Sequence, residues 1–265
     1  MKKYFTLTKA GILESLTFRL GMFISFFGNI IYLIIIYFLW KAIFDSSPTG
    51  IVNGMTFSDT MIYLVLAGSL VSMVEVFLVF QMGYKVQKGI IVLDLLKPIR
   101  FGAYMFFSNT GDVVVKAFTV FLPTAIVVYF VSGRGIPLGV NLLIFIPSFI
   151  FGFIINYMIN MIIGTLCLYT QSSWGINIMK EIIISLLSGA SIPLAFFPEG
   201  IRAVVDLLPF QAIYHSPLQI LLHNDLSSQT ILSMFTNQLI WMIILFVSAS
   251  LFWKWSLKRI TVNGG

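Results

Sequence analysis

The sequence has little cysteine and little charge, and each shortage excludes a class of protein. Cys167 is the single cysteine in 265 residues, so the chain cannot close an internal disulfide and lacks the paired spacing of a structural zinc site. Only 10% of the residues are charged, whereas soluble proteins average about 25%. A soluble enzyme, a soluble nucleic-acid-binding domain and a disordered segment are therefore excluded.

The motifs that carry catalysis and nucleotide binding are also missing. No G-x-x-x-x-G-K-[ST] phosphate loop, H-E-x-x-H or G-x-S-x-G pattern occurs in the chain. His215 and His223 have no clear acidic partner, and we interpret them as ordinary loop residues. We therefore expect no catalytic residue, no metal site and no cofactor bound by this chain, so work that needs ATP would depend on another subunit.

Long apolar runs dominate what is present. Hydrophobic residues make up 58% of the chain, 26 residues are phenylalanine, and the mean hydropathy is +0.98. A helix of about 20 apolar residues crosses the roughly 30 Å hydrocarbon layer of a membrane. We predict an all-α integral membrane protein with six transmembrane helices, at 21–44, 61–82, 106–131, 138–169, 176–197 and 237–255.

The stretch before the last span is less regular than the others. The predicted span 176–197 is short and contains Gly189 and Pro193, and the segment 198–222 is apolar but interrupted by charged residues and prolines. We interpret 198–222 as short re-entrant helices on the outer face that pack inward, because irregular backbone at membrane depth needs protein or water beside it. The alternative is a plain fifth helix followed by an amphipathic surface loop.

Basic residues determine the predicted orientation. With six spans and both termini in the cytoplasm, twelve lysines and arginines lie inside, whereas Lys41, Arg134 and Arg202 lie outside. This bias is the positive-inside pattern of membrane proteins. The net charge of +6 then reflects topology, and no nucleic-acid partner is expected. The predicted cytoplasmic residues are Lys2, Lys3, Lys9, Arg19, Lys85, Lys88, Lys97, Arg100, Lys180, Lys254, Lys258 and Arg259.

Residues 1–20 are predicted to form an amphipathic helix. Ile12, Leu13, Leu16 and Leu20 recur at helical spacing, with charged residues between them. We expect this helix to lie along the inner surface of the membrane, in contact with lipid head groups. The alternative is a simple extension of the first span.

The loop after the second span, 84–97, has the features of a docking element. A helix from Lys88 to Leu96 would place Leu93 and Leu96 on one face, and Pro98 would end it. An exposed apolar face flanked by charges on the cytoplasmic side suits the docking of a soluble partner. The alternative is that the apolar face lies on the lipid.

Four residues inside the membrane are candidates for a substrate pathway or a seam between subunits: Glu75, Asn156, Asn160 and Pro193. A charge at mid-bilayer costs about 2.5–3.5 kcal/mol, which makes the glutamate notable. It falls in line with Gly68 and Ser72, and the asparagines fall in line with Gly152 and Gly164. The alternative for both stripes is helix packing, because small residues permit close contact and asparagine can bond across it.

Four segments and their order resemble a known family. They are 89–98, which ends in Asp-Leu-Leu-Lys-Pro; 188–198, Ser-Gly-Ala-Ser-Ile-Pro-Leu-Ala-Phe-Phe-Pro; 208–211, Leu-Pro-Phe-Gln; and the Gly-Gly terminus, 264–265. With the amphipathic helix, the six spans and the broken segment, they resemble the permease subunit of an ATP-binding-cassette (ABC) exporter of the second, drug- and polysaccharide-export type, in a bacterial branch. The resemblance covers essentially the whole chain, so 1–265 is interpreted as one membrane domain.

The resemblance implies partners and a place in the cell. A cytoplasmic ATPase, in two copies, would bind ATP and Mg²⁺, and 84–97 would form the coupling helix that sits in a cleft of that ATPase. A second permease subunit, identical or homologous, would complete a pathway for an amphipathic drug, peptide or lipid-like substrate across the bacterial inner membrane. The alternatives are a secondary carrier without an ATPase and a membrane-embedded enzyme. The coupling residues implied are Lys88, Ile91, Leu93, Asp94, Leu96 and Pro98.

Overall fold

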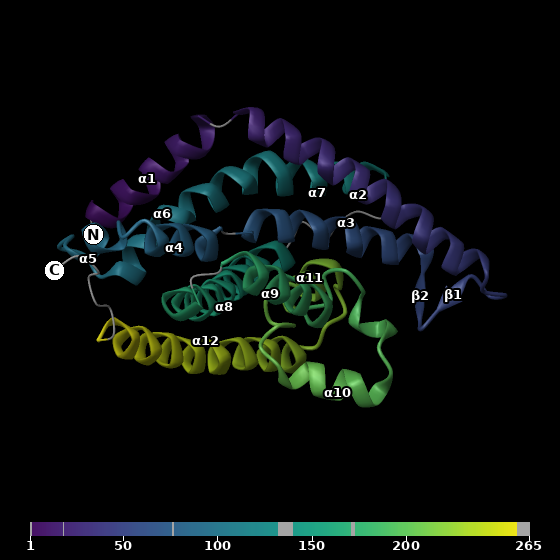
Figure 1. The fold of residues 1–265 in the computed structure, drawn as a ribbon. Helices are drawn as coiled ribbons and strands as arrows, with labels where there is room; N and C mark the ends of the chain where they lie inside the picture. Colours follow the sequence, from purple (N-terminus) through teal and green to yellow (C-terminus); the bar gives the residue numbers. More distant parts are fainter. Residues whose placement is uncertain (1, 18, 76, 132–139, 171–172, 259–265) are drawn as a thin grey trace.

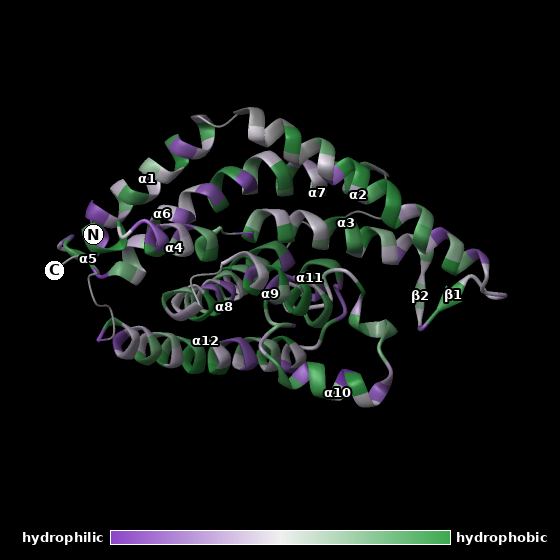
Figure 2. Ribbon diagram, viewed as in Figure 1, coloured by the Kyte–Doolittle hydropathy of each residue, from purple (hydrophilic) through white to green (hydrophobic). Residues whose placement is uncertain are grey.

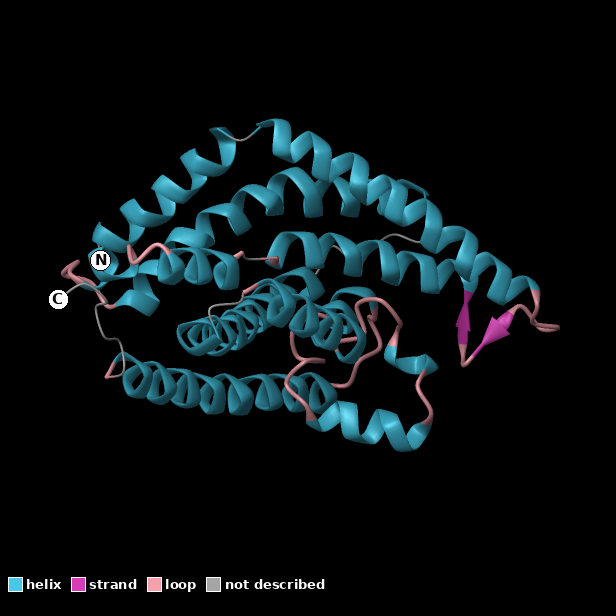
Figure 3. Ribbon diagram, in the orientation of Figure 1, coloured by secondary structure: helices cyan, strands magenta, loops and turns pink. Residues whose placement is uncertain are grey.

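The structure is a computed structural model that describes residues 2–17, 19–75, 77–131, 140–170 and 173–258 (Figure 1). The described chain is almost entirely helical, which confirms the predicted all-α class (Figure 3). Its strands are two short ones, β1 (Ile51–Val52) and β2 (Met55–Thr56), which pair in an antiparallel hairpin. The two residues between them, Asn53 and Gly54, have the positive φ angles that a tight two-residue turn requires.

The helices are α1 (Lys2–Thr17), α2 (Arg19–Asp45), α3 (Phe57–Val74), α4 (Leu78–Gln87), α5 (Ile91–Leu95), α6 (Phe101–Lys116), the π-helical η1 (Ala117–Phe121), α7 (Leu122–Val131), α8 (Val140–Thr170), α9 (Trp174–Leu187), the 3-10 helix η2 (Leu194–Phe196), α10 (Glu199–Leu207), α11 (His215–Leu222) and α12 (Ser228–Leu257). Helix α8 lies at the centre, where α4, α11 and α12 pack against it.

Five helical segments in the described residues are long and apolar enough to cross a membrane: Phe27–Asp45, Phe57–Gln87, Phe101–Phe130, Val140–Thr170 and Ser228–Leu257. They coincide with five of the predicted spans and confirm a multi-pass membrane protein. The last is longer than predicted because Ser227 accepts a hydrogen bond from the Thr230 N–H at 3.1 Å and starts the helix early. Hydropathy detects only the apolar part of such a helix.

The remaining predicted span, 176–197, is not a continuous membrane-spanning helix. Helix α9 has 14 residues, which gives about 21 Å, less than the hydrocarbon layer. It ends at Ser188, Gly189 follows with a φ of 78°, and Pro193 leads into the short η2. The glycine allows the chain to leave the helix and the proline cannot continue it, so the count of six full spans is not confirmed.

The segment 198–222 divides into one exposed helix and one buried helix. Helix α11 packs inward as predicted: the carbonyl oxygens of Ala212 and Ile213, just before it, lie so near Gly152 that an added Cβ there would be 3.0 and 2.7 Å away. Helix α10 instead lies on the surface and exposes Ile201, Val204 and Leu207. The re-entrant interpretation therefore suits α11 better than α10.

The described part of the predicted amphipathic helix 1–20 is α1, Lys2–Thr17, together with the first residues of α2. One face packs along α6, and Gly11 and Gly111 meet so closely that an added Cβ on Gly111 would lie 2.5 Å from the Gly11 backbone. Leu13 points outward and is 57% exposed. An interfacial position for α1 remains a prediction.

The two ends of the described chain are formed by different elements. Figure 1 shows the start of α1, helix α5 and the end of α12 at one end, with the β1–β2 hairpin and α10 at the other. The Phe101 and Trp253 rings stack with centroids 4.6 Å apart, which joins the start of α6 to the end of α12. Figure 2 shows apolar residues along α2, α3 and α12, and hydrophilic residues near α5 and on α10.

Candidate docking loop and intramembrane polar sites

The loop between the second and third spans begins later than predicted. Helix α4 continues to Gln87 and is capped at Lys88, so the first residues of the predicted element 84–97 belong to the span. Gly89 has a φ of 68°, which few other residues adopt, and it turns the chain out of α4. The helix predicted from Lys88 to Leu96 is therefore the single turn α5, with Leu96 as its cap.

The six predicted coupling residues divide into an outward and an inward set. Leu93 and Leu96 point outward and are 63% and 77% exposed, and Lys88 and Pro98 are also exposed. Ile91 is buried in the apolar core. The two leucines, which share a face as predicted, are the apolar surface that this loop offers. We call Lys88–Pro98 the docking loop.

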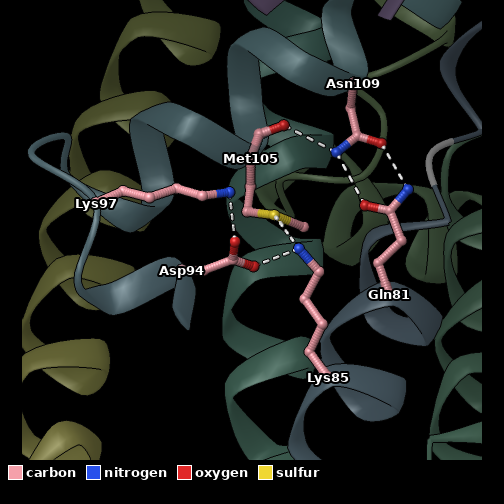
Figure 4. A network of polar contacts seen from close by, with 6 residues as sticks. All are labelled: Gln81, Lys85, Asp94, Lys97, Met105 and Asn109. Carbon is pink, nitrogen blue, oxygen red and sulfur yellow. Dashed lines mark hydrogen bonds and ion pairs between the residues drawn. The ribbon is translucent and has the colours of Figure 1, made fainter. Parts of the chain in front are cut away.

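The sixth coupling residue, Asp94, is buried and anchors the loop (Figure 4). One carboxylate oxygen pairs with the Lys97 ammonium at 2.6 Å, and the other pairs with the Lys85 ammonium from α4. The Lys97 ammonium also stands 3.9 Å from the centre of the Tyr104 ring on α6. Burial opposes ionisation of Asp94, but the two ammonium groups outweigh it and hold the pKa of this carboxyl below its ordinary value.

A second polar contact in the same network joins α4 to α6. The side-chain amides of Gln81 and Asn109 exchange hydrogen bonds of 3.2 and 3.3 Å, and Asn109 also donates to the Met105 carbonyl at 2.8 Å (Figure 4). The Lys85 ammonium lies 3.9 Å from the Met105 sulfur. The docking loop is therefore held to two spans at its base.

Sequence reasoning did not find Lys85, Lys97 or Tyr104 as parts of this site. The available signal was that Asp94 is the single acidic residue among four basic ones between 83 and 100. A lone carboxylate in such a run attracts several ammonium groups. The contact with the tyrosine depends on how α6 packs, which the spacing does not indicate.

The span that carries the predicted stripe through Glu75 is not one continuous helix, and the stripe itself remains a prediction. Helix α3 ends at Val74, and Glu75 has a ψ of 106°, outside the helical range. Gly68 and Ser72 face α2 instead, where Ser72 donates to Asn29 at 3.3 Å. The Glu75 side chain is exposed on the described surface of this chain, and its place in a pathway or seam remains a prediction.

The stripe along α8 is buried within the chain. Asn156 donates to the Val74 carbonyl at 3.2 Å, and Asn160 accepts from the Lys180 ammonium at 2.6 Å. Lys180 is thus buried beside α8, where it also pairs with Glu181, and its cytoplasmic placement remains a prediction. This geometry is that of helix packing, and a pathway role for the two asparagines remains a prediction.

The third span carries an ion pair near the interruption of the second span at Glu75. Asp112 and Lys116, one turn apart on α6, pair at 2.8 Å, and Ser15 of α1 donates to Asp112 at 2.8 Å. The Lys116 ammonium also donates to the Glu75 carbonyl at 3.2 Å. Lys116 of α6 therefore meets the interrupted backbone of the second span, and Ser15 of α1 contributes only through Asp112.

Pro193, the last candidate, is buried in the turn before η2. Gly189 in the same turn lies against the Tyr63 hydroxyl, which an added Cβ would approach to 3.0 Å. This turn is packed against α3, and its role in a pathway remains a prediction. Among the described residues, no three His, Cys, Asp or Glu side chains come together as metal ligands.

Several membrane-spanning helices around a buried polar layer, with a basic, leucine-bearing loop at one end, define a multi-pass membrane protein; in a bacterium it lies in the inner membrane. The sequence model of the ABC-2 family transporter protein matches residues 30–264, and the chain belongs to that family. This confirms the resemblance inferred from the motifs. A search of curated proteins finds no match. The family indicates a membrane subunit of an ABC exporter, itself a transport component without catalysis, that assembles with an ATPase.

Proposed function

We propose that this chain is the membrane-spanning half of an ABC exporter that receives force from its ATPase through the docking loop. One observation carries the proposal: Leu93 and Leu96 stand outward on a loop whose Asp94 is buried between two lysines. Two ATPase copies would bind ATP and Mg²⁺ outside this chain. A second permease subunit, identical or homologous, would complete the pathway.

The two leucines gain free energy when a partner protein buries them. Burying a leucine side chain stabilises a contact by about 1.5–3 kcal/mol, so two adjacent leucines favour a protein surface that excludes water. The ion pairs at Asp94 fix the loop before binding, which lowers the entropy lost on docking. A loop that is rigid at its base also transmits displacement to α4 and α6.

We propose a substrate class from the scarcity of charge inside the spans, a feature that lipid-facing helices share. Most side chains on the described helices are apolar, which suits an amphipathic drug, peptide or lipid-like molecule and does not suit a highly charged solute. We propose that ATP binding draws the two docking loops together and that the spans change packing in response. The work is a shift between two conformations that nucleotide and substrate favour differently.

The test is co-purification with the ATPase from the native cell. Leu93→Asp and Leu96→Asp place a charge on the docking face, and we expect either variant to retain at most a tenth of the bound ATPase, the loss expected from about 1.4 kcal/mol. Leu207→Asp is the matched control, since this exposed leucine lies on α10 at the opposite end. Equal ATPase recovery with all three variants would contradict the proposal.

A further inference from the structure

The interruption of the second span has no local cause in the sequence. Between Val71 and Met82 there is neither glycine nor proline, and the whole stretch is apolar except for Ser72, Glu75 and Gln81. Helix kinks ordinarily occur at proline, at glycine, or where a side chain inserts into the backbone hydrogen bonds. Only the last of these applies here.

Two side chains from other helices donate to backbone carbonyls at the interruption. A helix leaves its last carbonyls without partners, and inside a membrane these need donors. Asn156 of α8 donates to the Val74 carbonyl at 3.2 Å, and Lys116 of α6 donates to the Glu75 carbonyl at 3.2 Å. Asn156 is 4% exposed, so water does not compete strongly for it.

The neighbouring third span departs from the α-helix at the same place. The π-helical turn η1 begins directly after Lys116, and α3 packs against it. π-Helical turns within α-helices are rare and occur frequently at functional sites. Two adjacent spans are thus irregular near Lys116: the second span at Glu75, which this lysine contacts, and the third span directly after the lysine.

The two parts of the second span have different principal neighbours. Helix α4 packs tightly on α8, where an added Cβ at Gly164 would lie 2.5 Å from the Met82 sulfur, and it carries the docking loop through Lys85 and Asp94. Helix α3 packs against α2, η1 and α7, and also against α6 and α11. Along the second span, a movement of the docking loop therefore meets the interrupted backbone before it reaches α3; a second route runs through α6.

We propose that the second span is a two-state element. In its open state, which this structure shows, the helix is interrupted at Glu75, and Asn156 and Lys116 are the positioning residues that stabilise the interruption. In the second state the span is one continuous helix through Glu75, in which its own N–H groups replace the two side-chain donors. Exchange between these states lets α3 and its neighbours move relative to the body that carries the docking loop. Its use in transport rests on the proposed function, whereas the two states do not.

The test reads the backbone at Glu75 directly. The full chain in lipid nanodiscs, labelled with ¹³C on its four glutamates, gives Cα signals whose shifts distinguish extended from helical backbone, and Glu75→Gln identifies the relevant one. In the native chain we expect the extended signal to dominate. Asn156→Leu or Lys116→Met should shift the ratio of open to continuous span by about tenfold toward the helical signal, the effect of one net hydrogen bond.

Two further variants separate this role from general stability. Lys116→Gln retains a donor and should restore much of the extended signal. Asn160→Leu removes an asparagine one turn along α8 whose side chain accepts from Lys180 and donates to the Asn156 carbonyl, and it should leave Glu75 extended. If Asn156→Leu does not fold, the two Lys116 variants decide.

The outcomes that overturn the proposal are equally definite. An extended Glu75 in every folded variant, or an equal helical shift with Asn160→Leu, refutes the two-state element. These spectra need no ATPase, so they are independent of docking. If instead the native chain fails to bind the ATPase, the proposed function fails and the result at Glu75 still stands.

Discussion

Asp94 anchors the docking loop, and Asp94→Asn removes the charge from both of its ion pairs while preserving shape. Hydrogen bonds to charged groups contribute about 1.5–3 kcal/mol each when shielded from water. Here the Lys85 and Lys97 side chains are 21% and 41% exposed, so solvent screens part of the attraction. We expect local opening of the docking loop to become easier by about 2 kcal/mol.

Amide hydrogen exchange of residues 88–100 measures this opening. A loss of about 2 kcal/mol accelerates exchange about thirtyfold if the loop opens locally. The matched control is Asp206→Asn, because Asp206 pairs with Arg202 at 3.9 Å and both side chains are about half exposed. The Asp206→Asn substitution should change the rate of amide exchange around residue 206 about twofold or less. Unchanged exchange of 88–100 in Asp94→Asn would refute the anchoring role.

Three other predictions concern acid, close packing and a buried amide. The pKa of Asp94 lies below its ordinary value of about 4, so the carboxylate stabilises the docking loop fully above about pH 4 and loses this effect as the pH falls through the lower folded pKa. Amide exchange of 88–100, corrected for the intrinsic effect of pH, should show this loss in the native chain and not in Asp94→Asn. Gly111→Ala forces a Cβ to 2.5 Å from the α1 backbone and should lower the free energy of unfolding by about 1–3 kcal/mol in thermal unfolding. Gly175→Ala should not lower it, because no atom lies within 4 Å of the added Cβ. Gln238→Leu removes buried hydrogen bonds to the Ala212 and Ser148 carbonyls and from the Ser148 hydroxyl, and it should lower the free energy of unfolding by about 1–3 kcal/mol in thermal unfolding.

Hydropathy predicted most of the fold because a membrane span is defined by its composition. It identified the runs that became α2, α8 and α12. It could not predict the interruption at Glu75, since the donors that hold it open, Asn156 and Lys116, lie far away in the sequence. The division of 176–197 was partly visible in its glycine and proline, but their effect on helix length depends on packing.

The docking loop was predicted in outline and corrected in detail. Leu93 and Leu96 share an outward face because a helical turn places them together. Ile91 and Asp94 turn inward, which the amphipathic pattern did not separate from the outward set because the loop is only one turn long. Spacing cannot fix the facing of so short a helix without knowledge of its neighbours.

Photo-cross-linking from position 96 in native membranes tests the central claim most directly. A photoreactive amino acid replaces Leu96, and the adducts are identified by mass spectrometry, with Leu207 on α10 as the control position. We predict that the photoreactive residue at position 96 cross-links to a cytoplasmic subunit with an ATP-binding phosphate loop and that the one at position 207 does not. Adducts of Leu96 with lipid alone would contradict it.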